Sequence, residues 1–188
     1  MRKMKEIPMV NSWDEYFHNF CLVAAGNSKC LSRKIGAILV KDKRLISTGY
    51  NGPPEGVPRC DERWRIDNVL MAELGKLIHS KKVKDVSELR GKCPRLVIGF
   101  KSGEGLDWCV AAHAEENAIL SAARTGVCTK GTTMYMTCGV PCTKCLVKII
   151  NAGIRDLVVT SFNLYDISSE YLVKEARINV RLFNFLKE

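Results

Sequence analysis

The sequence predicts an α/β fold in which helices cover both faces of one mixed sheet of about five strands. The first observation is two β-rich segments, 35–41 and 44–50, joined by a short polar turn at Asp42, which indicates an antiparallel hairpin. The second is the alternation of helical and strand patterns after residue 113. The third is the length of 188 residues without a repeat or an obvious linker, which favours one domain with a sizeable core.

Local patterns place the elements in order. Ser12 followed by Glu15 predicts a capping box, and apolar residues then recur at helical spacing until Gly26 and Asn27 stop the helix. Residues 61 to about 80 have a helical pattern, and a basic stretch, a short apolar run at 95–100 and a glycine-containing loop follow. The remaining expected elements are a helix at 114–124, a strand at 132–138, a helix at 142–151, a strand at 156–161, a helix at 168–176 and a strand at 178–183.

Composition limits the class of protein. No apolar run approaches the roughly 18 residues of a membrane span, and the basic N-terminal segment leads into no signal-peptide core, so we expect a cytoplasmic protein of a bacterium or of a virus-infected host cell. The nine cysteines, an odd number at irregular spacing, favour buried thiols and metal ligands over a disulfide framework.

The net charge of +9 should attract anions such as nucleic acid or phosphorylated metabolites. Part of the excess positive charge lies at residues 79–95, which contain six Lys or Arg residues but one Asp and one Glu. A solvated surface is the favoured interpretation of that stretch, and a dedicated binding patch is the alternative.

Three side chains have the spacing of a metal site. Cys142 and Cys145 are spaced so that both thiolates can face one ion from the first turn of a helix, which Pro141 suits as a helix start. His113, at another helix start, can supply a third ligand and leave the fourth tetrahedral position open for water. Glu115 is then close enough to take a proton from that water without binding the metal.

Each part of this pattern has an ordinary structural explanation when it stands alone, because a CxxC pair is often a structural zinc half-site and HxE occurs by chance. Together, the HxE and PCxxC segments form the signature of zinc nucleobase deaminases. The segments "SRKIGAILV", "ISTGYNG", "HAEENAI", "MYMTCGVPCTKC" and "INAGIRDLVV" follow the order of the deoxycytidylate (dCMP) deaminase family, and the resemblance covers most of residues 12–165.

This resemblance implies a three-layer α/β/α fold of the cytidine deaminase type, with one deaminase domain over 1–188 and a variable insertion at about 60–108. It also implies a homo-hexamer regulated by dCTP and dTTP, with Mg²⁺ accompanying the regulatory triphosphate. The implied partner is a small nucleotide, with neither a membrane nor a stable nucleic-acid partner.

The resemblance extends to individual residues. It implies substrate contacts by Asn51 to the sugar, by Ala114, and by Tyr165 near the phosphate. The alternative is turn chemistry for Asn51 and plain packing for Tyr165. Some phage relatives carry a second, structural zinc, which here implies Cys30 and Cys60 with ligands from the insertion; Cys93 and Cys109 or His79 are the candidates, and free buried thiols are the alternative.

The expected function is therefore zinc-dependent hydrolytic deamination of dCMP to dUMP and ammonia, which would supply thymidylate synthesis. Glu115 would move the proton of the attacking water to N3 and then to the departing amino group. The alternatives are a deaminase that also accepts dCTP, and one that acts on cytosine or adenine in nucleic acid, which the charge favours but the absence of aromatics interleaved with Lys and Arg disfavours. A non-enzymatic zinc module is a further alternative.

Overall fold

The computed structural model describes residues 10–101 and 103–186. Its centre is a five-stranded sheet in the order β2-β1-β3-β4-β5, with β1 antiparallel to β2 and β3, and β3, β4 and β5 parallel to one another. The predicted mixed sheet is confirmed. The strands are β1 (Gly36–Lys41), β2 (Arg44–Tyr50), β3 (Thr133–Met136), β4 (Asp156–Val159) and β5 (Asn179–Leu182).

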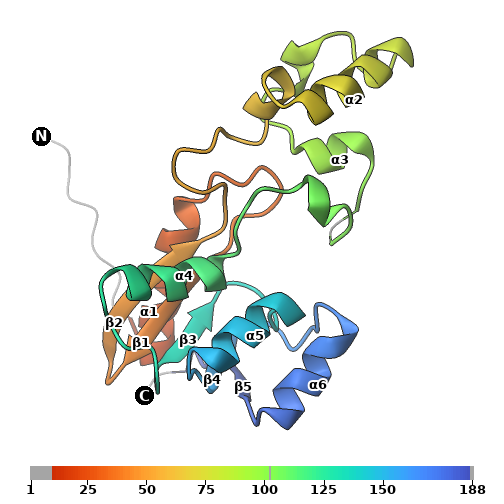
Figure 1. The fold of residues 1–188 in the computed structure, drawn as a ribbon. Coiled ribbons are helices and arrows are strands. Elements are labelled where there is room, and N and C mark those ends of the chain that lie inside the picture. Colours follow the sequence, from red (N-terminus) through yellow and green to blue (C-terminus); the bar gives the residue numbers. More distant parts are fainter. Residues whose placement is uncertain (1–9, 102, 187–188) are drawn as a thin grey trace, which may run out of the picture.

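The helices occupy three layers with the sheet (Figure 1). On one face, Phe17 and Cys21 of α1 pack against Ile38, Val40 and Tyr135 of the sheet. The other face is covered by α4 and α5, and α6 lies beside α5. The three-layer α/β/α prediction is therefore confirmed. The helices around the sheet are α1 (Trp13–Gly26), α4 (Ala114–Arg124), α5 (Thr143–Asn151) and α6 (Ile167–Glu175).

Alternation along β1 explains how one strand serves both layers. Ala37 and Leu39 belong to the core under α4 and α5, whereas Ile38 and Val40 belong to the core under α1, and all four are buried. A strand that is buried on both faces reads as a continuous apolar run, as "AILV" does here. The turn after it uses left-handed backbone at Asp42 and Lys43, with φ of 48° and 60°, which matches the tight hairpin predicted from the sequence.

Two glycines let helices approach the sheet closely. A Cβ at Gly49 of β2 would lie 2.2 Å from the carbonyl oxygen of Ala114 and from the nitrogen of Ala118 in α4. On the opposite face, a Cβ at Gly36 of β1 would lie 2.0 Å from the carbonyl oxygen of Cys21 in α1. Because no side chain fits at either position, glycine fixes how near α4 and α1 lie to the sheet.

The opening helix begins as predicted. The Ser12 hydroxyl accepts a hydrogen bond from the Glu15 N–H at 3.1 Å. In a capping box the Glu15 carboxylate would accept from the Ser12 N–H. Here it accepts from the Asn11 N–H at 2.6 Å, so this second hydrogen bond is displaced by one residue.

The segment between β2 and α4 forms a lobe with its own apolar cluster, which includes Trp64, Leu70 and Leu89 (Figure 1). The helical pattern predicted over 61 to about 80 corresponds to two helical elements, because Asp67 starts a new helix by accepting from the Val69 and Leu70 N–H groups. The lobe contains α2 (Asn68–His79), α3 (Pro94–Ile98) and 3₁₀ turns at Glu62–Arg65, Val86–Leu89 and Leu106–Trp108. Thus the short apolar run at 95–100 contributes a helix.

The basic stretch at 79–95 is mostly a solvated surface of this lobe, as the favoured interpretation predicted. Lys81, Lys82 and Lys84 are exposed, while Val83 and Leu89 turn into the apolar cluster. The division into one deaminase domain with an insertion at about 60–108 stays a prediction. Within the described residues, no helix combines the length and apolar character needed to cross a membrane.

Candidate metal centre and substrate site

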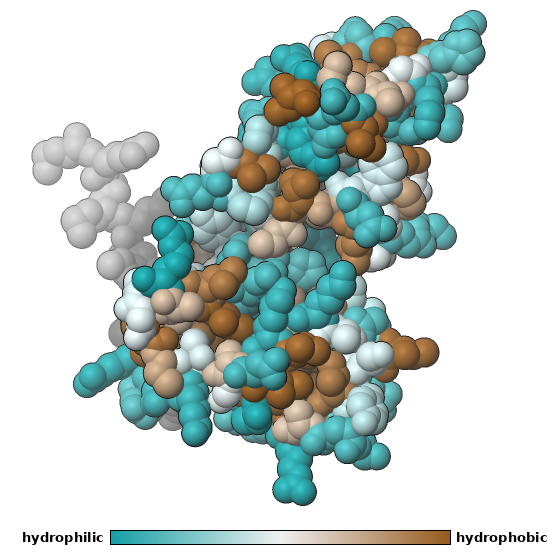
Figure 2. Space-filling model, in the orientation of Figure 1, coloured by the Kyte–Doolittle hydropathy of each residue, from teal (hydrophilic) through white to brown (hydrophobic). Residues whose placement is uncertain are grey.

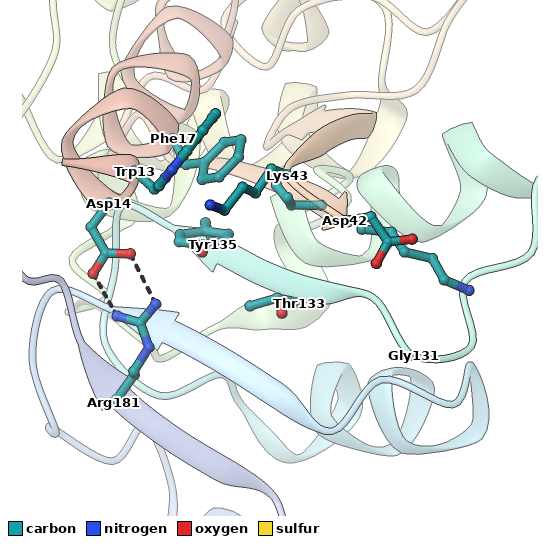
Figure 3. Close-up of a pocket in the computed structure, with 11 residues that line it drawn as sticks. Trp13, Asp14, Phe17, Asp42, Lys43, Gly131, Thr133, Tyr135 and Arg181 are labelled. Atoms are coloured by element: carbon teal, nitrogen blue, oxygen red, sulfur yellow. Dashed lines mark hydrogen bonds and ion pairs between the residues drawn. The ribbon is translucent and has the colours of Figure 1, made fainter. Parts of the chain in front are cut away.

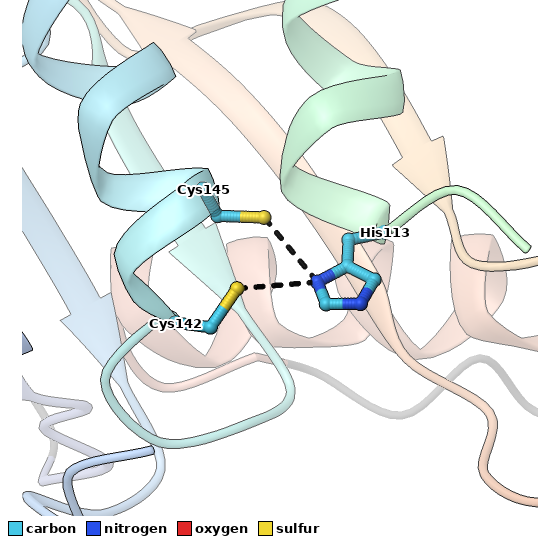
Figure 4. A group of neighbouring side chains, drawn as sticks. All are labelled: His113, Cys142 and Cys145. Atoms are coloured by element: carbon cyan, nitrogen blue, oxygen red, sulfur yellow. Dashed lines mark hydrogen bonds between the residues drawn. The ribbon is translucent and has the colours of Figure 1, made fainter. Parts of the chain in front are cut away.

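Three potential metal ligands meet where two helices begin (Figure 4). His113 is the N-cap of α4, Cys142 is the N-cap of α5, and Cys145 lies in the first turn of α5. The Nδ1 atom of His113 is 3.6 Å from the Cys142 sulfur and 3.3 Å from the Cys145 sulfur. Within the described part of the chain, this is the one group of three or more ligand atoms that all lie within 4.8 Å of one another.

The geometry fits a tetrahedral zinc ion. With Zn–N and Zn–S bonds of about 2.0 and 2.3 Å, tetrahedral ligation separates a nitrogen from a sulfur by about 3.6 Å. The distances from His113 to the two sulfurs are close to that value. Two thiolates and one imidazole are donors that zinc prefers, and three protein ligands leave one position for water or substrate.

One of the two thiols, that of Cys142, is prepared for ionisation. The pKa of Cys142 is lowered, because Cys145 and then His113 hydrogen-bond to its sulfur. The pKa of Cys145 is raised by the same hydrogen bond, because the Cys145 thiol keeps the proton that it shares with Cys142. The pKa of His113 is raised by its hydrogen bond to Cys142. A metal ion would replace these shared protons, so binding should release protons.

Glu115 lies in the first turn of α4 and is 5% exposed. Burial raises the pKa of its carboxyl group, although the nearby charge of His113 opposes this effect. An acidic group in the first turn also benefits from the helix dipole. A buried carboxylate two residues from a metal ligand has the placement that a proton carrier requires.

Asp166, which the sequence analysis did not single out, holds the start of α5. Its carboxylate accepts from the Thr143 N–H at 2.8 Å and from the Thr143 hydroxyl, directly after Cys142. It also caps α6 by accepting from the Ser169 N–H at 3.0 Å, and the Ser169 hydroxyl donates to the Pro141 carbonyl at 3.0 Å. One carboxylate therefore fixes the helix that carries two of the three candidate ligands.

Asn51 follows β2 and braces the loop before β1. Its Oδ1 atom accepts from the Ile35 N–H and the Ser28 hydroxyl, each at 2.8 Å, and its amide donates to the Arg33 carbonyl at 2.8 Å. The side chain is buried. These bonds give Asn51 a structural role, and its contact to a sugar stays a prediction.

Ala114 and Tyr165 have different environments. Ala114 is fully buried at the first position of α4, beside His113. Tyr165 follows β4, is 37% exposed, and its hydroxyl lies against the insertion, 3.6 Å from where a Cβ would stand at Gly103. Their substrate contacts stay predictions.

The other four candidate cysteines lie near one another, around Cys60. The pKa of Cys60 is raised to about 11, by burial and then by the charges of Cys109, Cys93 and Cys30. No three of their sulfur atoms lie within 4.8 Å of one another, so they are less closely grouped than the ligand atoms of the first centre. His79 ends α2 and is exposed.

A mixed sheet that carries His, Cys and Cys at neighbouring helix starts defines a zinc-binding α/β class of protein. The sequence pattern of the cytidine and deoxycytidylate deaminase zinc-binding region matches residues 11–161. The chain therefore belongs to this family.

The chain is similar to the deoxycytidylate deaminase of Schizosaccharomyces pombe, with 35% identity over 173 residues, 92% of this chain and 44% of the relative. It is also similar to the deoxycytidylate deaminase of Enterobacteria phage T2, with 40% identity over 135 residues, 70% of each. The chain thus spans less than half the length of the yeast relative. Among solved structures, the apo dCMP deaminase of cyanophage S-TIM5 has a TM-score of 0.59 at 19% identity, covering 93% of this chain and 99% of the other, which shows the fold.

Proposed function

We propose that the chain catalyses the hydrolytic deamination of dCMP to dUMP and ammonia. The observation that carries the proposal is the convergence of His113, Cys142 and Cys145 at two helix starts, with the buried carboxylate of Glu115 beside them. Its family and the names of its relatives support the substrate.

His113, Cys142 and Cys145 would hold the zinc, which when bound supplies a Lewis acid and lowers the pKa of water. Glu115 takes one proton from the attacking water and delivers it to N3 of the cytosine. It then carries the second proton of that water, from the hydroxyl group on C4, to the amino group, which leaves as ammonia while C4 becomes a carbonyl. Its burial keeps competing solvent away from the proton. Asn51 would contact the sugar, Ala114 would line the base site, and Tyr165 would lie near the phosphate.

An assay of ammonia release tests this function most directly. The substrates are dCMP, dCTP, cytidine, deoxycytidine and a cytosine-containing oligonucleotide, each with the zinc-loaded protein. We expect dCMP to have the highest kcat/KM. Comparable turnover of dCTP would extend the substrate class, whereas no ammonia from any of them would favour a non-enzymatic zinc module.

A second, structural zinc at Cys30, Cys60, Cys93 and Cys109 is supported by the fold. Cys60 precedes Arg63, whose guanidinium donates to the Trp108 carbonyl at 2.9 Å, directly before Cys109. Cys30 lies beside Gly52, which pairs with Ala112. These contacts bring Cys60 and Cys109 of the lobe near Cys30, and the charges that act on Cys60 include that of Cys93. Four cysteines suit a closed structural site.

Metal analysis tests this second site. We expect about two zinc ions per chain, and about one in Cys60→Ser. Cys128→Ser is the matched control, because Cys128 is an exposed free thiol outside both groups. A content near one in the wild-type protein would leave the four cysteines as thiols of the fold.

We also assign the protein to the cytoplasm, because all nine cysteines are free thiols, as a reducing compartment favours.

We propose a homo-hexamer regulated by dCTP and dTTP with Mg²⁺. Apolar side chains are exposed over α5 and α6 (Figure 2), which supports assembly through this face. They include Val147 of α5, Phe162 and Leu164 of the loop between β4 and α6, and Ile167 at the start of α6, which is 94% exposed. Sedimentation of Ile167→Asp should show smaller particles than the wild-type protein if α6 lies in an interface.

A further inference from the structure

The helix α2 has a second apolar stripe beside the one that it buries. Leu70, Leu74 and Leu77 face the apolar cluster of the lobe between β2 and α4. Met71 and Ile78, one position after Leu70 and Leu77, are 46% and 41% exposed. Residues seven positions apart lie on the same side of a helix, so these two form a stripe next to the buried one. A helix that packs on one side needs only one stripe, and the second is left in contact with solvent.

The exposed stripe is open to a partner. It lies on the part of the lobe farthest from the sheet (Figure 1), where apolar side chains share the surface with hydrophilic ones (Figure 2). Gly75 lies between Met71 and Ile78, and a Cβ there would meet no atom within 4 Å. Glycine destabilises the middle of a helix relative to alanine, but here it lets a partner lie close to the backbone. We call Met71, Gly75 and Ile78 the α2 stripe.

A group of cations follows directly at the C-terminal end of the α2 stripe. The Lys81 N–H donates to the Ile78 carbonyl at 2.9 Å, and the Lys82 N–H donates to the Leu77 carbonyl at 3.0 Å, so the chain folds back against the end of the helix. Lys81, Lys82 and Lys84, the lysine cluster, are exposed, and no ion pair among the described residues includes them.

Several cations elsewhere on the surface have contacts within the molecule. Arg181 forms an ion pair with Asp14, and the Lys43 ammonium lies 4.9 Å from the centre of the Trp13 ring (Figure 3). On the lobe, by contrast, residues 79–92 hold five Lys or Arg residues and only two acidic residues. The excess charge of the lobe is therefore available to attract an acidic partner.

We propose that the α2 stripe and the lysine cluster bind an acidic amphipathic helix of another protein. Apolar side chains of that helix would cover the stripe, and its carboxylates would pair with the lysines. A nucleic acid is a poorer match, because α2 has no Phe, Tyr or Trp on which a base could stack. A second copy of this face would be repelled, because both faces carry the same cations. The assignment does not depend on the proposed deaminase function.

Calorimetric titration of the zinc-loaded protein with a synthetic peptide tests this surface. The peptide is an amphipathic helix of about 20 residues, with leucines along one face and glutamates along the other. The control ligand is the same peptide with lysines in place of the glutamates. We expect the acidic peptide to bind with an affinity that falls as the salt concentration rises, and the lysine peptide not to bind.

Two double variants separate the apolar contribution from the charged one. Lys82→Glu combined with Lys84→Glu should weaken binding of the acidic peptide at least about tenfold and reduce its dependence on salt. Met71→Gln combined with Ile78→Gln should weaken binding about tenfold and leave the salt dependence unchanged, because glutamine suits a helix and keeps the charge.

The matched control is Arg44→Glu combined with Lys130→Glu, which changes the net charge by the same amount at exposed positions outside the lobe. This control should bind the acidic peptide as the wild-type protein does. Circular dichroism of all three double variants should match that of the wild-type protein, which shows that a loss of binding is not a loss of fold.

Absence of binding by the wild-type protein at about 1 mM peptide, or an equal loss in the matched control, would overturn the proposal. Vesicles of phosphatidylcholine with phosphatidylglycerol, or a single-stranded oligonucleotide, would replace the acidic helix as the partner if they bound as tightly and with the same sensitivity to the glutamine variant. Sedimentation in which the wild-type protein forms larger particles than the glutamine variant would replace it with a second copy of the chain.

Discussion

Glu115 and Glu116 are neighbours in the sequence with opposite environments. Glu115 is buried beside His113, whereas Glu116 reaches the surface and forms an ion pair with Lys148 of α5. The HxE spacing places the first carboxylate at the metal centre, and the helical turn places the second between α4 and α5. The two residues therefore offer a matched test of chemistry against structure.

Glu115→Gln should lower kcat for dCMP by about 10²- to 10⁴-fold, because the amide keeps the shape of the side chain but cannot carry the proton. Zinc content and dCMP binding should change little. Steady-state kinetics with metal analysis measure both quantities, and Glu116→Gln, as the control, should keep kcat within a few-fold. Near-normal turnover of Glu115→Gln would require another proton carrier.

Asp166→Asn should weaken zinc retention, because an amide cannot accept hydrogen bonds from Thr143 and Ser169 as fully as the carboxylate does. Loss of such a partner beyond the ligands typically costs about 10- to 100-fold in metal affinity or activity. Competition with a chelator measures the affinity. Asp85→Asn is the control, since Asp85 caps a turn of the insertion in the same way, by accepting from the Ser87 N–H. Equal chelator resistance of the two variants would refute the positioning role of Asp166.

At the scale of elements, local signals predicted most boundaries. The helix at 114–124 and the hairpin turn at Asp42 were predicted correctly, because periodicity and turn chemistry are local properties. From the sequence, Asp166 could have been identified only as a helix cap. Its hydrogen bonds to Thr143 join residues that are 23 positions apart, and no local sequence pattern indicates such a contact. The lobe between β2 and α4 was irregular in the sequence for a related reason, since its short helices are stabilised by their shared apolar cluster.

The close approach of β2 to α4 gives a prediction for stability. Gly49→Ala should lower the free energy of unfolding by about 1–3 kcal/mol, because the new Cβ would overlap backbone atoms of Ala114 and Ala118. Denaturant unfolding measures the change, and zinc affinity should fall with it, since α4 carries His113 at its start. The control is Gly75→Ala, at an exposed position of α2 with open space around it. This variant should raise the free energy of unfolding by about 0.5–1 kcal/mol. Equal stability of the two variants would contradict the packing argument.

At the scale of the whole molecule, the net charge of +9 is compatible with two functions, deamination of free nucleotides and deamination of bases in nucleic acid. Part of the positive charge lies on the lobe between β2 and α4, where Lys81, Lys82 and Lys84 are exposed. The exposed aromatics that could stack bases are spread over several elements: Trp13 and Tyr16 on α1, Tyr50 at the end of β2, Phe162 and Tyr165 after β4, Tyr171 on α6 and Phe185 after β5. This distribution favours long-range attraction of anions over an extended track for a strand.

The dependence on salt distinguishes the two functions. A site for one nucleotide holds one phosphate group, whereas an enzyme that neutralises about five phosphates of a single strand would lose affinity with a logarithmic slope of about −3.5 in salt concentration. We predict that KM for dCMP rises only gently between low and physiological salt. We also predict that an oligonucleotide neither competes well with dCMP nor releases ammonia. If a single-stranded oligonucleotide were deaminated faster than dCMP at equal cytosine concentration, the net charge would be the better guide to function than the geometry of the metal centre.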